Sequence, residues 1–321
     1  MKLGVLTVPL YNLAVEEAFE YLSGLGVQAV EIGCGGFPGD KHMQPARVAD
    51  DPAVAAHYKE ILQKNKLEIS ALSVHGNPVH PNKEIARKAH EEFIQTCRAA
   101  QTLGVDTVVT FSGCPGDWEG AKYPNWVTCA WPEDFQAILE YQWNQVLIPY
   151  WKQAVKEAAQ YGVHKIALEM HPGFCVYNAG TLLRLREAVG EAIGANFDPS
   201  HLFWQGTDPV QAIRALQGAI YHFHAKDTAI DPVNTAVNGV LDSTNYGDIV
   251  NRSWVFRTVG YGHDLKKWKE MVSMLKATGY DGALSIEHED GLMSVQEGLE
   301  KGIAFLKEIL IYEDPAAMWW A

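Results

Sequence analysis

Short apolar runs alternate along the chain with longer amphipathic stretches. The runs are rich in Val, Ile, Ala and Phe at consecutive positions, which is typical of strands buried on both faces of a parallel sheet. Residues 14–26 and 84–104 have the spacing of amphipathic helices and end at a glycine, a common helix stop. Eight apolar runs predict eight strands, at residues 3–8, 27–33, 68–74, 106–112, 164–170, 194–198, 220–226 and 282–288.

Several junctions repeat one order: helix, glycine-containing turn, apolar strand. The segments YLSGLGVQAVEI, AAQTLGVDTVVTF and MLKATGYDGALSIE follow it. Such repetition indicates a βα array, and eight units over 321 residues give about 40 residues each. We therefore predict an α/β fold, a single (β/α)8 TIM barrel domain over residues 1–321. A doubly wound open sheet is the alternative, but no GxGxxG turn follows the first run.

Two connections are longer than the rest, and both follow a predicted strand. Residues 112–133 come after strand 4 and residues 227–262 after strand 7. In a parallel barrel the loops that follow strands form the face that carries the active site. We expect both to wall a substrate pocket, with Trp118 and Trp126 in contact with substrate. Packing against a second copy in a homo-oligomer is the alternative for these loops.

Composition narrows the class of protein. Hydrophobic residues make up 47% and charged residues 20%, an ordinary globular composition. The formal net charge of −13 argues against nucleic-acid and anionic membrane partners. Five cysteines without CxxC spacing suggest reduced thiols, and no signal peptide is visible, so we expect a cytoplasmic protein.

Four consecutive predicted strands carry a potential ligand at the C-terminal end. These are Glu169, Asp198, His224 and Glu287. In a barrel those ends converge, and three uncompensated carboxylates would repel one another. A divalent cation resolves this conflict, and three oxygens with one nitrogen suit Mn²⁺, Mg²⁺, Co²⁺ or Zn²⁺. We expect one ion per chain, with Mn²⁺ as first choice because carboxylates dominate the set.

Several motifs extend this set over nearly the whole chain. The chain resembles the xylose isomerase-like barrel superfamily, which includes ketose 3-epimerases, inosose dehydratases, hydroxypyruvate isomerases and endonuclease IV. The resemblance implies that the same four residues hold one metal. The motifs that carry it are EMHPG (169–173), DPSH (198–201), HFHAKD (222–227), GYG (260–262) and SIEHED (285–290).

The resemblance implies proton chemistry next to a carbonyl, through a metal-stabilised enediolate. Glu169 and Glu287 would remove and return the proton, which gives a sugar isomerase or epimerase of carbohydrate metabolism. The same proton removal can instead be followed by loss of a leaving group, which gives a lyase or dehydratase acting on a keto-sugar, keto-glycoside or inosose. The continuation after Glu169 differs from that of the epimerases, so the resemblance does not specify a ketose 3-epimerase.

Further candidates surround this set. His201 resembles a family histidine that binds a substrate oxygen, and Arg257 is the candidate for an arginine that polarises one. The predicted substrate-binding residues also include His75, His171 and Lys226; His75 is in addition an alternative acid–base group.

Two other classes remain as alternatives. An endonuclease IV-like enzyme would need about three metal ions and a basic face, and the acidic net charge argues against DNA. A barrel that only binds a ligand would not need the complete acid set.

Overall fold

Eight parallel strands close into a barrel, which confirms the predicted fold. The computed structural model describes residues 1–314, 316–318 and 320. Around the barrel the strand order is β1-β10-β7-β6-β5-β4-β3-β2. The barrel strands are β1 (Lys2–Leu6), β2 (Ala29–Gly33), β3 (Glu68–Ser73), β4 (Thr107–Phe111), β5 (Lys165–Glu169), β6 (Ile193–Phe197), β7 (Ile220–Ala225) and β10 (Ala283–Ile286).

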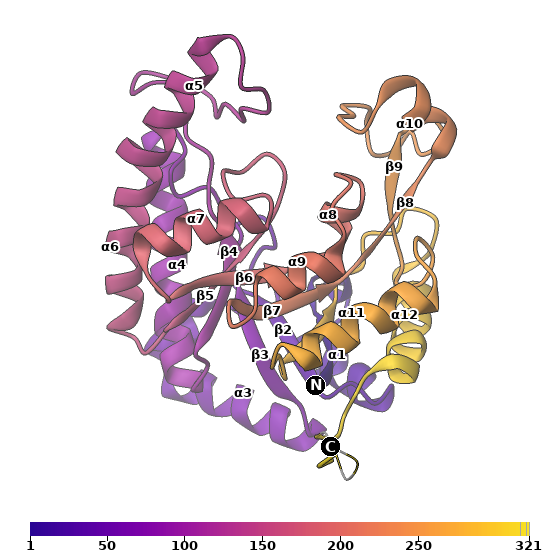
Figure 1. Ribbon diagram of the computed structural model, residues 1–321. Coiled ribbons are helices and arrows are strands. Elements are labelled where there is room, and N and C mark those ends of the chain that lie inside the picture. Colours follow the sequence, from indigo (N-terminus) through magenta and orange to yellow (C-terminus); the bar gives the residue numbers. More distant parts are fainter. Residues whose placement is uncertain (315, 319, 321) are drawn as a thin grey trace.

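Helices connect the strands and surround them (Figure 1). The two helices expected from the apolar spacing are α1 and α4; α4 begins where Asn82 accepts a hydrogen bond from the Glu84 N–H and ends at left-handed Gly104. The α-helices are α1 (Val15–Gly24), α2 (Pro45–Asp50), α3 (Pro52–Asn65), α4 (Lys83–Leu103), α5 (Glu133–Glu140), α6 (Ile148–Ala159), α7 (Ala179–Val189), α8 (Ser200–Phe203), α9 (Pro209–Ala215), α10 (Pro232–Asn238), α11 (Leu265–Ala277) and α12 (Val295–Ile309). A 3₁₀ turn, η1 (Val8–Leu10), and a π-helical segment, η2 (Tyr141–Leu147), complete the set.

The apolar core lies mainly between the strands and the surrounding helices. Inside the barrel a small cluster of Ala71, Val109 and Ala167 fills part of the space. Charged and polar side chains are buried there as well, among them Glu31 and His222. Buried polar groups need hydrogen-bond partners, so the charged and polar side chains inside the barrel indicate a polar binding site there.

Both long connections rise at the same end of the barrel, opposite the chain termini (Figure 1). The one after β4 leads without regular structure into α5. The one after β7 contains an antiparallel hairpin of β8 (Asp227–Ile230) and β9 (Trp254–Arg257), with α10 between its strands. The sequence predicts the length of this connection but not its hairpin, because residues 246–254 show no clear period.

One carboxylate closes the base of the hairpin connection. Oδ2 of Asp227 accepts hydrogen bonds from the backbone N–H groups of Gly262 and His263 and from the indole N–H of Trp268, at 3.1, 2.9 and 3.1 Å. Gly262 is required there, because a Cβ atom would lie 2.3 Å from the carbonyl oxygen of Thr228. The departing and returning chains are therefore held together at the rim of the barrel.

Two further findings concern membrane-spanning helices and the state of the cysteines. Among the helices of the described residues, none is long and apolar enough to cross a membrane. All five cysteines are free thiols, and four of them are buried.

Candidate active site

The four predicted metal ligands meet at the mouth of the barrel. Glu169 ends β5, Asp198 follows β6, His224 lies near the end of β7, and Glu287 follows β10. Each offers one ligand atom, and these four atoms lie within 4.8 Å of one another. Parallel strands end at one rim, so four successive strands bring these side chains to one point. The structure thus confirms the predicted proximity of the four side chains.

Opposite charges and hydrogen bonds hold the carboxylates ionised. The Nδ1 atom of His224 is 3.4 Å from Oε2 of Glu169 and 3.1 Å from Oε2 of Glu287. The Lys226 ammonium is 2.6 Å from Oε2 of Glu287 and 3.2 Å from Oδ2 of Asp198. Burial alone would raise the pKa of Glu287, but Lys226 and His224 outweigh it and lower the pKa to about 2. The pKa values of Asp198 and Glu169 are also lowered.

The donor set fits a divalent ion. Nδ1 of His224 and Oδ2 of Asp198 are buried, and neither has an aligned hydrogen-bond partner among the described residues. Both atoms have charged neighbours but no aligned hydrogen bond, and two such buried atoms in one cluster point to a ligand that satisfies them. Three carboxylate oxygens and one imidazole nitrogen are donors that Mn²⁺, Mg²⁺, Co²⁺ and Zn²⁺ accept. Lys226 lies at the edge of this set, against two of its carboxylates.

Two further histidines hold Glu169 in place. Nε2 of His75 is 2.9 Å from its Oε2 atom, and Nε2 of His201 is 3.1 Å from its Oε1 atom. His201 is also 3.2 Å from Oδ2 of Asp198. Burial alone would lower the pKa of His201, but Asp198 and Glu169 raise it to about 9. An imidazolium at this position can donate to a carboxylate or to a substrate oxygen.

His171 differs from its neighbour in charge. Its ring centroid lies 4.0 Å from that of His201. Burial, with the positive charge of His201, lowers the pKa of His171 to about 3. The two histidines at the mouth therefore differ in protonation state at neutral pH, one neutral and one cationic.

A cavity of about 390 Å³ adjoins the cluster through these two histidines. Both long connections contribute to its wall, Trp126 from the one after β4 and Tyr246 from the one after β7. Trp204 and Trp254 add a stacked pair of rings at 4.7 Å. The volume is that of a small-molecule site. Of the two predicted tryptophans, Trp126 lines this cavity, whereas Trp118 is 62% exposed and is not among the lining residues.

Arg257, at the end of β9, contacts Asp290 and Tyr261. Its Nε atom donates to Oδ2 of Asp290 at 3.0 Å, and its guanidinium lies over the ring of Tyr261. The described contacts of Arg257 include none of the four clustered ligands. Its role toward a substrate oxygen stays a prediction.

Glu31 is the site residue that the sequence analysis missed. It lies on β2, has no exposed surface, and both its carboxylate oxygens are 2.9 Å from Nε2 of His224. Glu31, His222 and His224 form a second group of potential ligands one layer below the mouth. The available signal was a lone acid inside the apolar run VQAVEIG.

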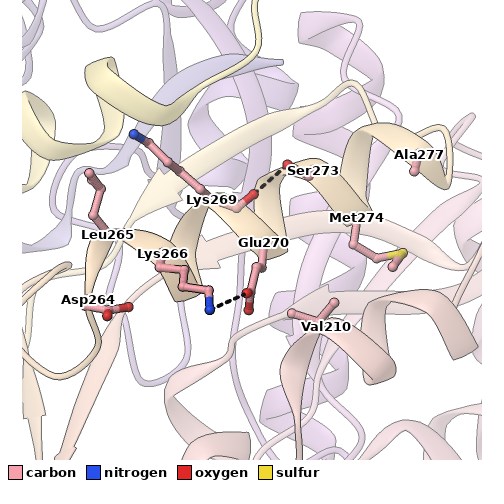
Figure 2. Close-up of a pocket in the computed structure, with 9 residues that line it drawn as sticks. All are labelled: Val210, Asp264, Leu265, Lys266, Lys269, Glu270, Ser273, Met274 and Ala277. Atoms are coloured by element: carbon pink, nitrogen blue, oxygen red, sulfur yellow. Dashed lines mark hydrogen bonds and ion pairs between the residues drawn. The ribbon is translucent and has the colours of Figure 1, made fainter.

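A larger surface hollow lies elsewhere, between α9 and α11 (Figure 2). It measures about 930 Å³ and is lined by Val210, Leu265 and Met274 beside charged side chains. Lys266 and Glu270 pair along the helix at 3.9 Å. It is an open groove on the outer helices with no convergent histidines or unpaired acids, so the smaller cavity at the mouth is the better candidate.

The family of the chain follows from comparison with known proteins. The chain matches the family model described as xylose isomerase-like TIM barrel over residues 19–309. The chain belongs to this family. A curated relative, the uncharacterized protein YfiH of Bacillus subtilis (strain 168), is 39% identical over 312 residues, which cover 97% of this chain and 99% of YfiH.

Solved structures share the fold over almost the whole chain. AsbF of Bacillus anthracis, a probable 3-DHS dehydratase, has a TM-score of 0.67 at 17% identity and covers 96% of this chain and 99% of its own. The IOLI protein, solved with a bound zinc atom, has a TM-score of 0.66 at 18% identity and covers 99% and 100%. The 3-keto-D-glucoside 4-epimerase YcjR of E. coli has a TM-score of 0.62 at 14% identity and covers 96% and 99%. At these identities the likeness shows the fold.

Proposed function

We propose that the protein is a divalent-metal-dependent sugar isomerase or epimerase that works by proton abstraction next to a carbonyl. The observation that carries this proposal is the mouth cluster: four donor atoms within 4.8 Å of one another, two of them buried without an aligned partner, beside a small-molecule cavity. Glu169, Asp198, His224 and Glu287 would hold the ion. Among the candidate ions Mn²⁺ is our first expectation.

Two glutamates are suited to move the proton. When bound, a divalent ion supplies positive charge that stabilises the negative charge developing on the substrate carbonyl oxygen. One carboxylate, Glu169 or Glu287, takes the proton from the carbon next to the carbonyl, and the electrons of the broken C–H bond pass to the C–C bond and the oxygen. In an epimerase the other glutamate must first take up a proton from solvent, which it gives to the opposite face of the same carbon while the first glutamate later releases its proton to solvent. In an isomerase a protonated glutamate gives the proton to the adjacent carbon.

His75 and His201 fix the orientation of Glu169, since each contacts a different carboxylate oxygen. His201 also lines the cavity, where its N–H can reach a substrate oxygen. Neutral His171 lies beside it and can accept from or donate to a hydroxyl group. The three histidines thus provide polar contacts that orient a polyhydroxylated substrate.

The lining of the cavity favours an uncharged sugar. Its described lining residues include neither lysine nor arginine, and its charged groups are the Asp242 carboxylate and the His201 imidazolium, which are opposite in sign. Aromatic rings form much of the rest, and aromatic faces suit the apolar faces of sugar rings. YcjR, which shares the fold, acts on a 3-keto-D-glucoside, so keto-sugars are the first compounds to examine.

A lyase or dehydratase acting on a keto-glycoside is a second candidate, favoured by the size and aromatic wall of the cavity. The first step is the same proton removal. The electron pair then expels an oxygen substituent from the β carbon, and His201 can donate a proton to that leaving oxygen. The probable dehydratase AsbF shares the fold.

Metal analysis separates these sugar enzymes from an endonuclease. About one ion per chain supports the sugar enzyme, whereas about three would support the nuclease. The net charge of −13 disfavours a DNA substrate. A cytoplasmic location and a homo-oligomeric state remain predictions.

The decisive experiment incubates Mn²⁺-loaded protein with ketoses, 3-keto-sugars and inososes in D₂O and follows them by NMR. We expect deuterium to enter one carbon next to a carbonyl, with a new isomer or an eliminated product. Glu169→Gln serves as the matched control and should show no incorporation. Absence of exchange from every compound in the metal-loaded protein would refute the proposal.

A further inference from the structure

One imidazole stands between two layers of carboxylates. Nδ1 of His224 faces Glu169 and Glu287 at the mouth, at 3.4 and 3.1 Å. Nε2 of the same ring faces Glu31 below, at 2.9 Å from each carboxylate oxygen. Both His224 and Glu31 have no exposed surface. The ring therefore connects the candidate metal site to an acid that the site itself does not contain.

The contacts of Glu31 determine which ring nitrogen carries the proton. The hydroxyl of Ser285 donates to Oε2 at 2.8 Å, and the hydroxyl of Ser73 donates to Oε1. Both carboxylate oxygens thus accept hydrogen bonds, and both lie 2.9 Å from Nε2 of His224, so this ring nitrogen is the donor in its contact with Glu31. Nδ1 is then the nitrogen whose lone pair is available to an ion at the mouth.

A second metal ion at Glu31 is the competing explanation. Glu31, His222 and His224 offer ligand atoms within 4.8 Å of one another. However, His222 already has partners on both ring nitrogens, with Nδ1 3.1 Å from Oδ1 of Asn196 and Nε2 3.3 Å from the Ser70 hydroxyl. Nε2 of His222 is 3.7 Å from Glu31, beyond hydrogen-bond distance. This layer is satisfied without an ion.

We propose that Glu31 is a positioning residue for the metal site: it fixes His224 as the Nε2-protonated tautomer, so that Nδ1 is presented to the ion. This inference rests on the proposed function, because it assumes that an ion binds at the mouth. A carboxylate that accepts from a ligand histidine orients the ring and makes it a better ligand, and loss of such a partner typically costs 10–100-fold in metal affinity. Glu31 does this across the barrel interior, because β1 and β10 separate β2 from β7 in the strand order.

The test measures Co²⁺ affinity by competition with a chelating dye, together with the visible spectrum of the Co²⁺ complex. Glu31→Gln should bind Co²⁺ about 10–100-fold more weakly and with an altered spectrum, because an amide can turn its NH₂ group toward Nε2. Glu68→Gln is the matched control: it makes the same substitution at an exposed acid that pairs with Lys2, and its affinity should stay within about threefold of wild type. Circular dichroism of the metal-free variants checks that both are folded.

A measurement on the unmodified chain keeps the proposal testable if Glu31→Gln does not fold. In Zn²⁺-loaded protein with ¹⁵N-labelled histidine, NMR should show His224 with Nδ1 on the metal and Nε2 protonated. Binding through Nε2 would overturn the proposal, and so would wild-type affinity and spectrum in folded Glu31→Gln. Two ions per wild-type chain, with one lost in Glu31→Gln, would overturn it in favour of a second metal site. If wild-type protein binds no divalent ion, the proposed function fails first, which distinguishes the two failures.

Discussion

The carboxylates at the mouth and the carboxylate beneath them are similarly buried but differ in their partners. Glu31 receives two hydroxyl donors and the Nε2–H of His224, so both its oxygens are satisfied. At the mouth, Oδ2 of Asp198 and Nδ1 of His224 lack an aligned partner among the described residues. Burial therefore does not by itself identify a ligand. A ligand atom is identified by convergence with other donors together with the lack of an aligned hydrogen-bond partner. This difference separates the mouth cluster, which would bind the ion, from Glu31, which supports it.

The same contrast sets the expected consequences of substitution. Removing one member of a buried charge pair leaves the other unpaired, which costs about 3–5 kcal/mol. Replacing a carboxylate by its amide keeps shape and some hydrogen bonds, so the fold survives and the chemistry is tested.

Removal of metal should have the largest effect. We expect a chelator to reduce turnover to background, and Mn²⁺ or Co²⁺ to restore it, because the positive charge at the mouth would be lost and regained. Activity assays before and after metal addition measure this. Thermal melting of the chelated protein serves as the control for unfolding, and full activity in the presence of chelator would contradict a metal role.

Glu169→Gln and Glu287→Gln should each lower kcat by about 10²–10⁴-fold, since an amide cannot accept the proton. Both variants should keep the circular dichroism spectrum of the wild type. Exposed Glu68, which pairs with Lys2, supplies a control in Glu68→Gln, and we expect its kcat to be unchanged. A near-normal rate in either mouth variant would rule out the two-base scheme.

The metal-free protein should lose stability as pH rises from about 6.5 to 9. The folded-state pKa of His201, about 9, lies above the ordinary value of 6.5, so its stabilisation is complete below pH 6.5 and is lost as pH rises through 9. A histidine whose pKa rises from 6.5 to about 9 on folding contributes about 3 kcal/mol of stability below that range. Denaturant unfolding of chelated protein at several pH values measures it.

His201→Asn should flatten this pH dependence relative to wild type. His57→Asn, at an exposed histidine paired with Glu16, is the control and should retain the wild-type slope. Equal slopes in all three proteins would show that His201 is not held cationic by Asp198 and Glu169.

Trp126→Ala should raise KM about tenfold for a keto-sugar carrying a second ring, since one aromatic contact contributes about 0.5–1.5 kcal/mol beyond area burial. Trp118→Ala, on the same connection but 62% exposed, should leave KM unchanged. Steady-state kinetics give both values. A change in oligomeric state without a change in KM, measured by light scattering, would assign the connection to a subunit contact instead.

Much of the fold could be predicted because its signals are local. Apolar runs separated by helix–glycine junctions indicate the barrel, and acids at four strand ends indicate the mouth cluster. Glu31 was not predicted as a site residue because it lies inside an apolar run, where the sequence does not say which side chains face the barrel interior. The pairing of Arg257 with Asp290 joins the end of β9 to the loop after β10, and no local pattern specifies such a contact. Trp118 and Trp126 look alike in sequence and differ only in the path of the chain.

The hydrogen bonds that Asp227 accepts have a consequence for how the connection after β7 can be altered. Because that carboxylate ties the outgoing chain to Gly262 and His263, residues 228–261 leave and re-enter the rim at nearly one place. Loop-closure cost rises slowly with length, so such a segment can be shortened, lengthened or exchanged as a cassette without shifting the register of β7. Changes in this segment can therefore alter the wall of the cavity while the clustered ligand residues stay in place. Grafting the segment between related barrels becomes a practical route to new specificities.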